Sequence, residues 1–176
     1  AMELSHFGAK VREPRSVIPA LSKNIPVIIK NTFNPTAKGT LISKENTNSE
    51  LRVQGISSID EVSLITVQGS GMIGEAGISM RLFRAVAEAS INVILITQCS
   101  SEHSITFAVL PNEAQKSKDA LNKEFEMELK SGLIDSIKVE NNLSIIAAVG
   151  ENMKNIPGVA SKFFNALSIN GINVVA

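Results

Sequence analysis

Apolar residues recur with a helical period in two long stretches of the chain. In residues 76–90, one stripe contains Ile78, Leu82, Ala85, Val86 and Ala89, and the charged residues lie away from it. In residues 112–130, a similar stripe contains Ala114, Leu121, Phe125 and Leu129. Apolar positions three to four residues apart are typical of a helix with one side buried and the other facing solvent. Both stretches are therefore predicted to be amphipathic helices.

Shorter apolar runs flank these helices and predict strands. The expected order is strands at 51–58 and 62–69, a helix at 76–90, strands at 91–98 and 103–110, a helix at 112–130, strands at 135–140 and 143–150, a helix at 156–169 and a strand at 171–176. Strand, helix, strand, strand, helix, strand is the order of a split βαβ unit. The pattern therefore predicts an α+β fold in which helices pack on one face of an antiparallel sheet.

The first fifty residues follow a different pattern. Residues 7–24 read as a helix interrupted by Pro14 and Pro19, and residues 25–31 read as a strand. The stretch 31–40 contains Asn-Pro and Gly, which favour turns, and the polar run 44–50 lacks any apolar period. We therefore place a domain boundary near residue 50.

Composition narrows the class of partner. The 176 residues contain 17 basic and 17 acidic side chains, so the charge gives no general attraction to nucleic acid or to a membrane surface. No apolar run approaches the ~20 residues that span a bilayer. The single cysteine, Cys99, fits a reducing, cytoplasmic setting, and His6 and His103 lack metal-ligand spacing. We expect small-molecule or protein partners, no metal and no catalytic residue.

An internal repeat is the strongest signal in the sequence. Residues 62–95 align with residues 143–176 without a gap, and ten of the thirty-four positions are identical. The identical pairs include Gly69 with Gly150, Met72 with Met153, Gly77 with Gly158, Phe83 with Phe164, and Ile91-Asn92-Val93 with Ile172-Asn173-Val174. The same structural unit is therefore predicted twice, and the second copy stops at its second strand.

The stretch Gly69-Ser70-Gly71-Met72-Ile73-Gly74 matches the G-x-G-x-x-G pattern of dinucleotide-binding turns. The second copy keeps only the first of the three glycines. A dinucleotide fold also needs an acidic residue at the end of the second strand, where this chain has Gln98. Both observations disfavour NAD binding, and an oxidoreductase fragment is the weakest of the alternatives considered.

Gly77 and Gly158 are kept in both copies, where the loop becomes a helix. The start of a helix has unpaired N–H groups and a partial positive charge, so it suits the carboxylate of an amino acid as well as a phosphate. Alternatively, these glycines only allow a helix and a strand to pack closely. The sequence pattern leaves both explanations open.

The duplicated strand, glycine loop, helix and INV strand resemble paired ACT domains, which are regulatory modules that bind small molecules, most often amino acids. The stretch FGAKVREPRSVIPALSKNIPVIIKNTFNPTAKGTLI resembles the segment that closes the catalytic domain of aspartate kinases. The stretch VQGSGMIG…GISMRLFRAVAEASINVILITQCSSEHSITFAV is similar to the first regulatory module of bifunctional aspartokinase–homoserine dehydrogenases. The chain departs from the usual family residues at Glu13, Glu75 and Ala76.

This resemblance implies a domain organisation. Residues 1–50 would be the end of a kinase domain and a linker, 51–61 a strand given to the second ACT unit, 62–142 the first ACT unit, and 143–176 the truncated second unit. The first ferredoxin-like βαββαβ unit would be inserted into the second. The fragment would not be an enzyme, whereas its parent would be an ATP- and Mg²⁺-dependent aspartate kinase, either alone or fused to a homoserine dehydrogenase. ACT units commonly pair through their sheets, so a homodimer is expected.

The resemblance also implies an effector site in the first unit, for feedback inhibition by an end-product amino acid. Its residues would be Gly74, Gly77, Ile78, Ser79, Asn92, Val93 and Gln98. The amide of Gln98 suits a hydroxyl side chain, and Ile94 stands where lysine-sensitive relatives have an aspartate. Threonine is therefore expected, with a lysine-sensing domain or a free-standing ACT regulator as the alternatives.

Overall fold

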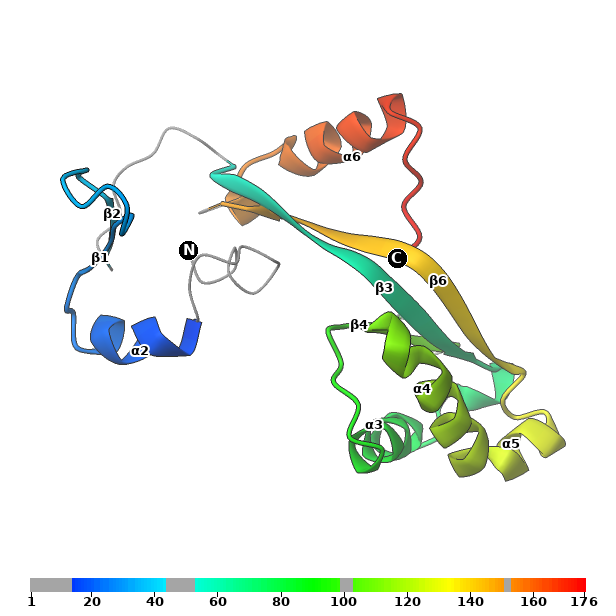
Figure 1. Ribbon diagram of the computed structural model, residues 1–176. Coiled ribbons are helices and arrows are strands. Elements are labelled where there is room, and N and C mark those ends of the chain that lie inside the picture. Colours follow the sequence, from blue (N-terminus) through cyan, green and yellow to red (C-terminus); the bar gives the residue numbers. More distant parts are fainter. Residues whose placement is uncertain (1–13, 44–52, 99–102, 151–152) are drawn as a thin grey trace. The chain divides into compact units, whose positions relative to one another are not determined.

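The computed structural model describes residues 14–43, 53–98, 103–150 and 153–176. The chain forms two compact units (Figure 1). We call Asp60–Ile145 the central unit, and the described residues before it together with Ile146–Val175 the outer unit. The central unit is continuous in sequence, and the outer unit comes from both of its flanks.

The central unit contains most of the sheet and three helices. Its elements are β3 (Gly55–Gln68), a 3₁₀ turn η1 (Ser70–Met72), α3 (Ile78–Glu88), β4 (Leu95–Gln98), β5 (Ser104–Val109), α4 (Pro111–Glu124), α5 (Glu126–Ser131) and β6 (Ser136–Val149). The sheet order is β4-β5-β3-β6, and β5 pairs antiparallel with both of its neighbours. Helices α3 and α4 pack against each other and share one core with the strands. The predicted α+β class with helices on an antiparallel sheet is confirmed.

The outer unit contains the remaining elements. They are α2 (Pro14–Ser22), the antiparallel pair β1 (Val27–Ile29) and β2 (Thr40–Ile42), the first residues of β3, the last residues of β6, η2 (Met153–Asn155) and α6 (Val159–Ile169). The expected helix 7–24 lies partly outside the described residues, and its described part begins at Pro14 and continues through Pro19. Proline lacks the N–H that an interior helical position donates. The sequence did not indicate β2.

The four strands expected at 51–58, 62–69, 135–140 and 143–150 are two long strands, β3 and β6. The expected breaks fall where each strand contains one residue with positive φ, Glu61 at 56° and Asn142 at 60°. A left-handed residue is typical of a β-bulge, which bends a strand without ending it. The prediction found the right positions but was wrong to separate the strands.

Two further predictions were wrong in extent. The helix expected at 112–130 bends at the fully buried Phe125, which separates α4 from α5. The strand expected at 91–98 begins only at Leu95, because Ile91 still donates its N–H to Val86 O (3.1 Å) at the end of α3. The strand expected at 171–176 is absent from the described structure. In the repeat, Leu95, the first residue of β4, corresponds to Ala176, so residues 171–175 correspond to the segment that precedes the strand.

The repeat is visible as equivalent backbone hydrogen bonds. Arg81 N–H donates to Gly77 O (2.9 Å), and Lys162 N–H donates to Gly158 O (3.0 Å). The Ile91 bond to Val86 has its counterpart in the bond from Ile172 N–H to Leu167 O (3.0 Å). Both copies therefore build the same start and the same end of their first helix.

Candidate functional site

The first two glycines of the G-x-G-x-x-G stretch face the protein's own backbone. A Cβ on Gly69 would lie 2.3 Å from Leu133 O, and a Cβ on Gly71 would lie 2.8 Å from Leu133 Cα. Gly69 N–H donates to His103 O (3.0 Å), and Asp135 N–H donates to Gln68 O (2.8 Å). These glycines are needed because the segment after α5 lies directly against the loop. The space that a pyrophosphate needs is therefore filled by the chain itself.

Gly77 and Gly158 have a different requirement. Each is the N-cap of its helix in the left-handed conformation, with φ of 94° and 87°. A Cβ at either position would meet no atom within 4 Å. Close packing of a helix on a strand is therefore not the reason for these glycines. The backbone conformation is the reason, because left-handed φ is costly for residues with a Cβ.

A cavity of about 310 Å³ lies at the start of α3 in the central unit. It is lined by Met72, Glu75, Gly77, Ile78, Ser79, Met80, Gln98 and Ile105. Four of the seven expected effector residues are thus brought together, because α3 starts beside the end of β4. Gln98 is exposed at the last position of this edge strand.

Backbone donors at the start of α3 are open to this cavity. The first backbone bond within the helix is donated by Arg81 to Gly77 O, and no side chain of the described residues caps the helix. The N–H groups of Ile78, Ser79 and Met80 precede that bond, so they have no acceptor within the helix. Three such donors together with the helix dipole favour a bound carboxylate.

The other three expected residues do not line the cavity. Gly74 has φ of 68° and belongs to the loop before it. Asn92 and Val93 lie between the end of α3 and the start of β4, away from Gln98. Asn92 N–H points to Glu113 Oε1 at 3.5 Å, and Val93 packs against the core. Within one copy of the chain, these residues are separated from the cavity by the length of β4.

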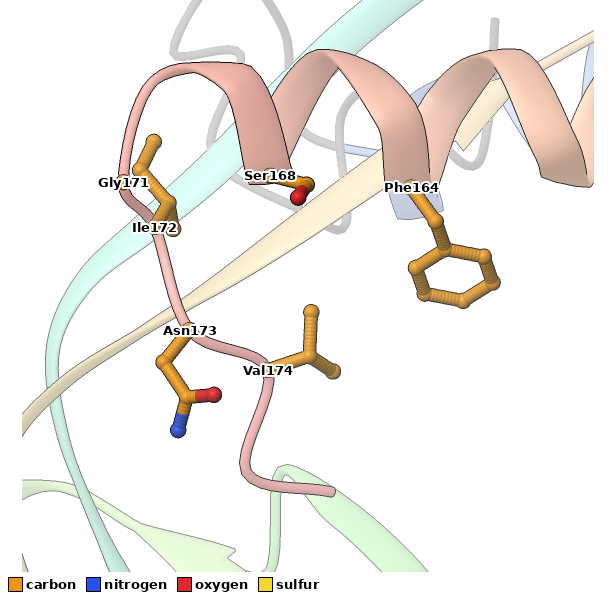
Figure 2. A pocket seen from close by; sticks show the side chains of 6 residues that line it. All are labelled: Phe164, Ser168, Gly171, Ile172, Asn173 and Val174. Atoms are coloured by element: carbon orange, nitrogen blue, oxygen red, sulfur yellow. The ribbon is translucent and has the colours of Figure 1, made fainter.

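A second hollow of about 390 Å³ lies under α6 in the outer unit. Figure 2 shows Phe164 on α6 and Val174 on the C-terminal segment facing it. In the central unit the corresponding residues, Phe83 and Val93, pack against the core. Ile172 is 47% exposed, whereas its counterpart Ile91 is 7% exposed. This hollow is therefore an uncovered part of a repeat rather than a formed binding site.

The polar side of α3 carries an ion cluster that the sequence did not indicate. Arg81 donates from Nε to Glu124 Oε1 (2.8 Å), from Nη1 to Glu128 Oε1 (2.5 Å) and from Nη2 to Glu124 O (3.0 Å). Its guanidinium also lies 4.9 Å from the centre of the Phe125 ring. Hydrogen bonds from Arg81 lower the pKa of both Glu124 and Glu128. The cluster holds α3 against α4 and α5.

Sequence reasoning also missed four lining residues of the cavity, Met72, Glu75, Met80 and Ile105. Glu75 was noticed only as a departure from the family pattern. The repeat carried a usable signal, because the residue that corresponds to Glu75 is Ile156. At this position one copy has a charged residue and the other has an apolar residue, so the fold that both copies share does not require the charge.

Neither a metal site nor a membrane-spanning helix is present in the described part of the chain. Among those residues, no group of three or more His, Cys, Asp or Glu side chains is placed to hold a metal ion. No helix there is long and apolar enough to cross a membrane.

Comparison with known proteins identifies the class. The sequence model of the ACT domain family matches residues 65–125 and 146–176, which is more than half of the chain. The chain therefore belongs to the ACT domain family and is a regulatory ACT region.

Several relatives in sequence and in structure are aspartate kinases or bifunctional enzymes that contain one. The chain is 46% identical over its whole length to the bifunctional aspartokinase/homoserine dehydrogenase of Haemophilus influenzae, of which it covers 22%. The crystal structure of Clostridium acetobutylicum aspartate kinase matches 99% of the chain, with 25% identity, a TM-score of 0.82 and 40% of that protein covered. Escherichia coli aspartokinase III in complex with lysine and aspartate matches 94% of the chain, with 28% identity, a TM-score of 0.68 and 36% of that protein covered. The resemblance to the regulatory region of aspartate kinases is thus confirmed, and the chain spans about a fifth of the bifunctional relative.

Proposed function

We propose that this chain is the allosteric regulatory region of an aspartate kinase and that it binds an amino acid in the cavity at the start of α3. One observation supports the proposal: the same cavity is lined by Gly77, Ile78 and Ser79 together with Gln98. These residues come from the start of α3 and the end of β4, and Ile78 and Gln98 are twenty residues apart in sequence. A volume of about 310 Å³ is at the small end of ligand pockets and suits a free amino acid.

Threonine is the effector that we favour. Its carboxylate would accept hydrogen bonds from the free N–H groups at the start of α3. Its hydroxyl would pair with the amide of Gln98, which can both donate and accept. Lysine is the alternative, since aspartokinase III of E. coli is a relative solved in complex with lysine. A buried lysine ammonium without an acidic partner at Ile94 would be costly.

Asn92 and Val93 enter the site through a second copy of the chain. Among the described residues, strand β4 is at the edge of its sheet, so one side of its backbone is without a partner strand there. Antiparallel pairing of two β4 strands would place Asn92 and Val93 of one copy beside Gln98 of the other. We therefore propose a homodimer in which each effector site is completed across the sheet edge.

Effector binding would act on a kinase domain in the same parent chain. An effector that prefers one arrangement of the dimer stabilises that arrangement by its difference in binding free energy, typically ~1–3 kcal/mol in allosteric proteins. ATP and Mg²⁺ would be bound by the kinase domain, and a cytoplasmic location is part of the same proposal. A free-standing ACT regulator is the alternative, and the length of the parent gene separates the two.

Calorimetric titration of the chain with L-threonine and L-lysine tests the effector. Threonine should bind more tightly, and Gln98→Ala should weaken threonine binding about tenfold, as expected for the loss of ~1.4 kcal/mol. Gln115→Ala is a matched control, because Gln115 is exposed on α4 and bonds only to Asp119 among the described residues. Lysine binding without threonine binding would refute the choice of effector. Equal affinities of Gln98→Ala and wild type would refute the role of Gln98.

A further inference from the structure

Glu75 is the charged side chain among the residues that line the effector cavity. None of the ion pairs formed by the described residues involves its carboxylate. The other polar groups of the lining are the hydroxyl of Ser79, the amide of Gln98 and the backbone donors of the helix start. Glu75 is an exposed residue, so the lining offers donors suited to an anion together with one solvent-accessible acidic residue suited to a cation.

The backbone fixes the position of Glu75 relative to the helix start. Its N–H donates to Met72 O (3.2 Å), which closes a turn after η1. Glu75 comes two residues before Gly77, the N-cap of α3. Glu75 is therefore carried by an ordered turn two residues before the helix whose first N–H groups have no acceptor within the helix.

A free amino acid matches this spacing of charges. Its carboxylate and ammonium groups are attached to the same carbon atom. When the carboxylate lies at the start of α3, the ammonium is held within a few ångströms of the residues that immediately precede the helix. The ε-ammonium of lysine lies four carbons farther away.

We propose that Glu75 binds the α-ammonium of the effector and makes the site selective for amino acids over hydroxy acids with the same side chain. The inference rests on the proposed effector site and adds a residue that determines its specificity. It assigns to the carboxylate a role that the backbone N–H donors of the helix start cannot fill, because N–H groups repel an ammonium.

The second copy of the repeat supports this assignment. The residue that corresponds to Glu75 is Ile156, and the residue that corresponds to Ser79 is Ala160. The turn itself is the same, since Ile156 N–H donates to Met153 O (3.2 Å). The fold of the turn therefore does not require an acidic residue, and the carboxylate distinguishes the cavity of the central unit.

Paired titrations of the whole chain test the inference. L-Threonine is compared with threo-2,3-dihydroxybutanoate, in which a hydroxyl replaces the ammonium. Wild type should bind threonine at least about tenfold more tightly than the hydroxy acid, as expected for a hydrogen bond between charged groups. Glu75→Gln should weaken threonine binding about tenfold and leave the hydroxy acid unchanged, so that the preference disappears. Glu75→Asp keeps the charge and should retain part of the preference.

Glu140→Gln is the matched control. Glu140 is exposed on β6 in the same unit, so the variant makes the same change of net charge away from the cavity. It should leave both affinities unchanged, and circular dichroism shows whether each variant is folded.

The outcomes separate the two proposals. If wild type binds threonine but Glu75→Gln keeps the full preference for threonine over the hydroxy acid, the role of Glu75 is wrong and the effector site stands. An effect of Glu75→Gln on lysine affinity alone would overturn the inference in favour of the ε-ammonium. If wild type binds neither threonine nor lysine, the effector site itself is wrong and the inference falls with it.

Discussion

Replacing Arg81 with alanine should strongly destabilise the central unit. Arg81 joins α3 to α4 and α5 through three donated hydrogen bonds, two to Glu124 and one to Glu128. The side chain of Arg81 is 30% exposed, and those of Glu124 and Glu128 are 20% and 17% exposed. The cluster is therefore mostly shielded from water, and its charges are screened less than those of surface pairs.

The size of the effect follows from what the substitution leaves behind. Hydrogen bonds to charged groups contribute ~1.5–3 kcal/mol each when buried, but they do not add fully within one network. Without Arg81, two neighbouring carboxylates face each other, and Glu128 Oε2 is already buried without a partner among the described residues. We expect the free energy of unfolding to fall by about 3 kcal/mol, near the lower end of the range for breaking a buried ion pair. For a unit of this size, that loss lowers the melting temperature by about 12–24 °C.

Thermal and urea unfolding, followed by far-ultraviolet circular dichroism, measure this loss. Arg84→Ala is the control on the same helix, because Arg84 is 51% exposed, donates one hydrogen bond of 3.2 Å to Glu124 and forms a longer ion pair of 3.9 Å with the exposed Glu88. It should cost under about 1 kcal/mol, as surface ion pairs do. If Arg81→Ala costs no more than Arg84→Ala, the cluster does not stabilise the unit and the reasoning fails.

Acid should remove the difference in the free energy of unfolding between wild type and Arg81→Ala. Hydrogen bonds from Arg81 lower the pKa of Glu124 and Glu128 in the folded state. A carboxylate with a lowered folded pKa stabilises the fold above its unfolded pKa, ~4.3 for Glu, and loses this contribution as the pH falls through the folded pKa. The two proteins should therefore differ fully above about pH 5, and the difference in their free energies of unfolding should shrink as the pH falls below ~4.3 and disappear once the pH is below the lowered folded pKa values. A difference that stays constant down to pH 2.5 would show that the effect is packing rather than charge.

Four further substitutions test other parts of the structure. Gly69→Ala should cost about 2 kcal/mol or more, because its Cβ would lie 2.3 Å from Leu133 O. Gly77→Ala, which meets no atom but keeps φ near 94°, should cost about 1–2 kcal/mol, and the opposite ranking of the two in urea unfolding would contradict the packing argument. Ile91→Ala should cost about 2–4 kcal/mol and its counterpart Ile172→Ala under about 1 kcal/mol, because only Ile91 is buried. Native-state hydrogen exchange reports each unit separately, and equal losses for the two isoleucines would show that both repeats have complete cores.

The hydrophobic pattern predicted the elements of the fold better than their ends. The helical stripe from Ile78 to Val86 is buried as expected, because amphipathic periodicity directly reflects burial on one face. The joining of four expected strands into β3 and β6 was missed. Polar residues at Glu61 and Asn142 look like turns in a sequence, and a single left-handed residue inside a continuous strand has the same composition.

The candidate site was only partly predictable from the sequence. Some residues could be identified by resemblance to a family, whereas others are known only from contacts in the folded structure. Gly77 and Gln98 could be expected from the resemblance to a family, and the structure places both beside one cavity. The cluster around Arg81 depends on which side chains from distant elements face each other. The hydrophobic pattern assigns Arg81 to the solvent side of α3, although its partners on α4 and α5 are more than forty residues away in sequence.

Comparison of the two repeats separates positions that encode the fold from positions that encode the site. Gly77 and Gly158 have nearly the same left-handed conformation, and the same backbone hydrogen bonds start and end both helices. These shared features are what any copy of the unit needs in order to fold. Glu75 and Ser79 have no polar counterpart in the second copy, and they line the cavity where Gln98 also lies. In a duplicated domain, the polar differences between structurally equivalent residues are therefore the better guide to the ligand than the glycines that both copies share.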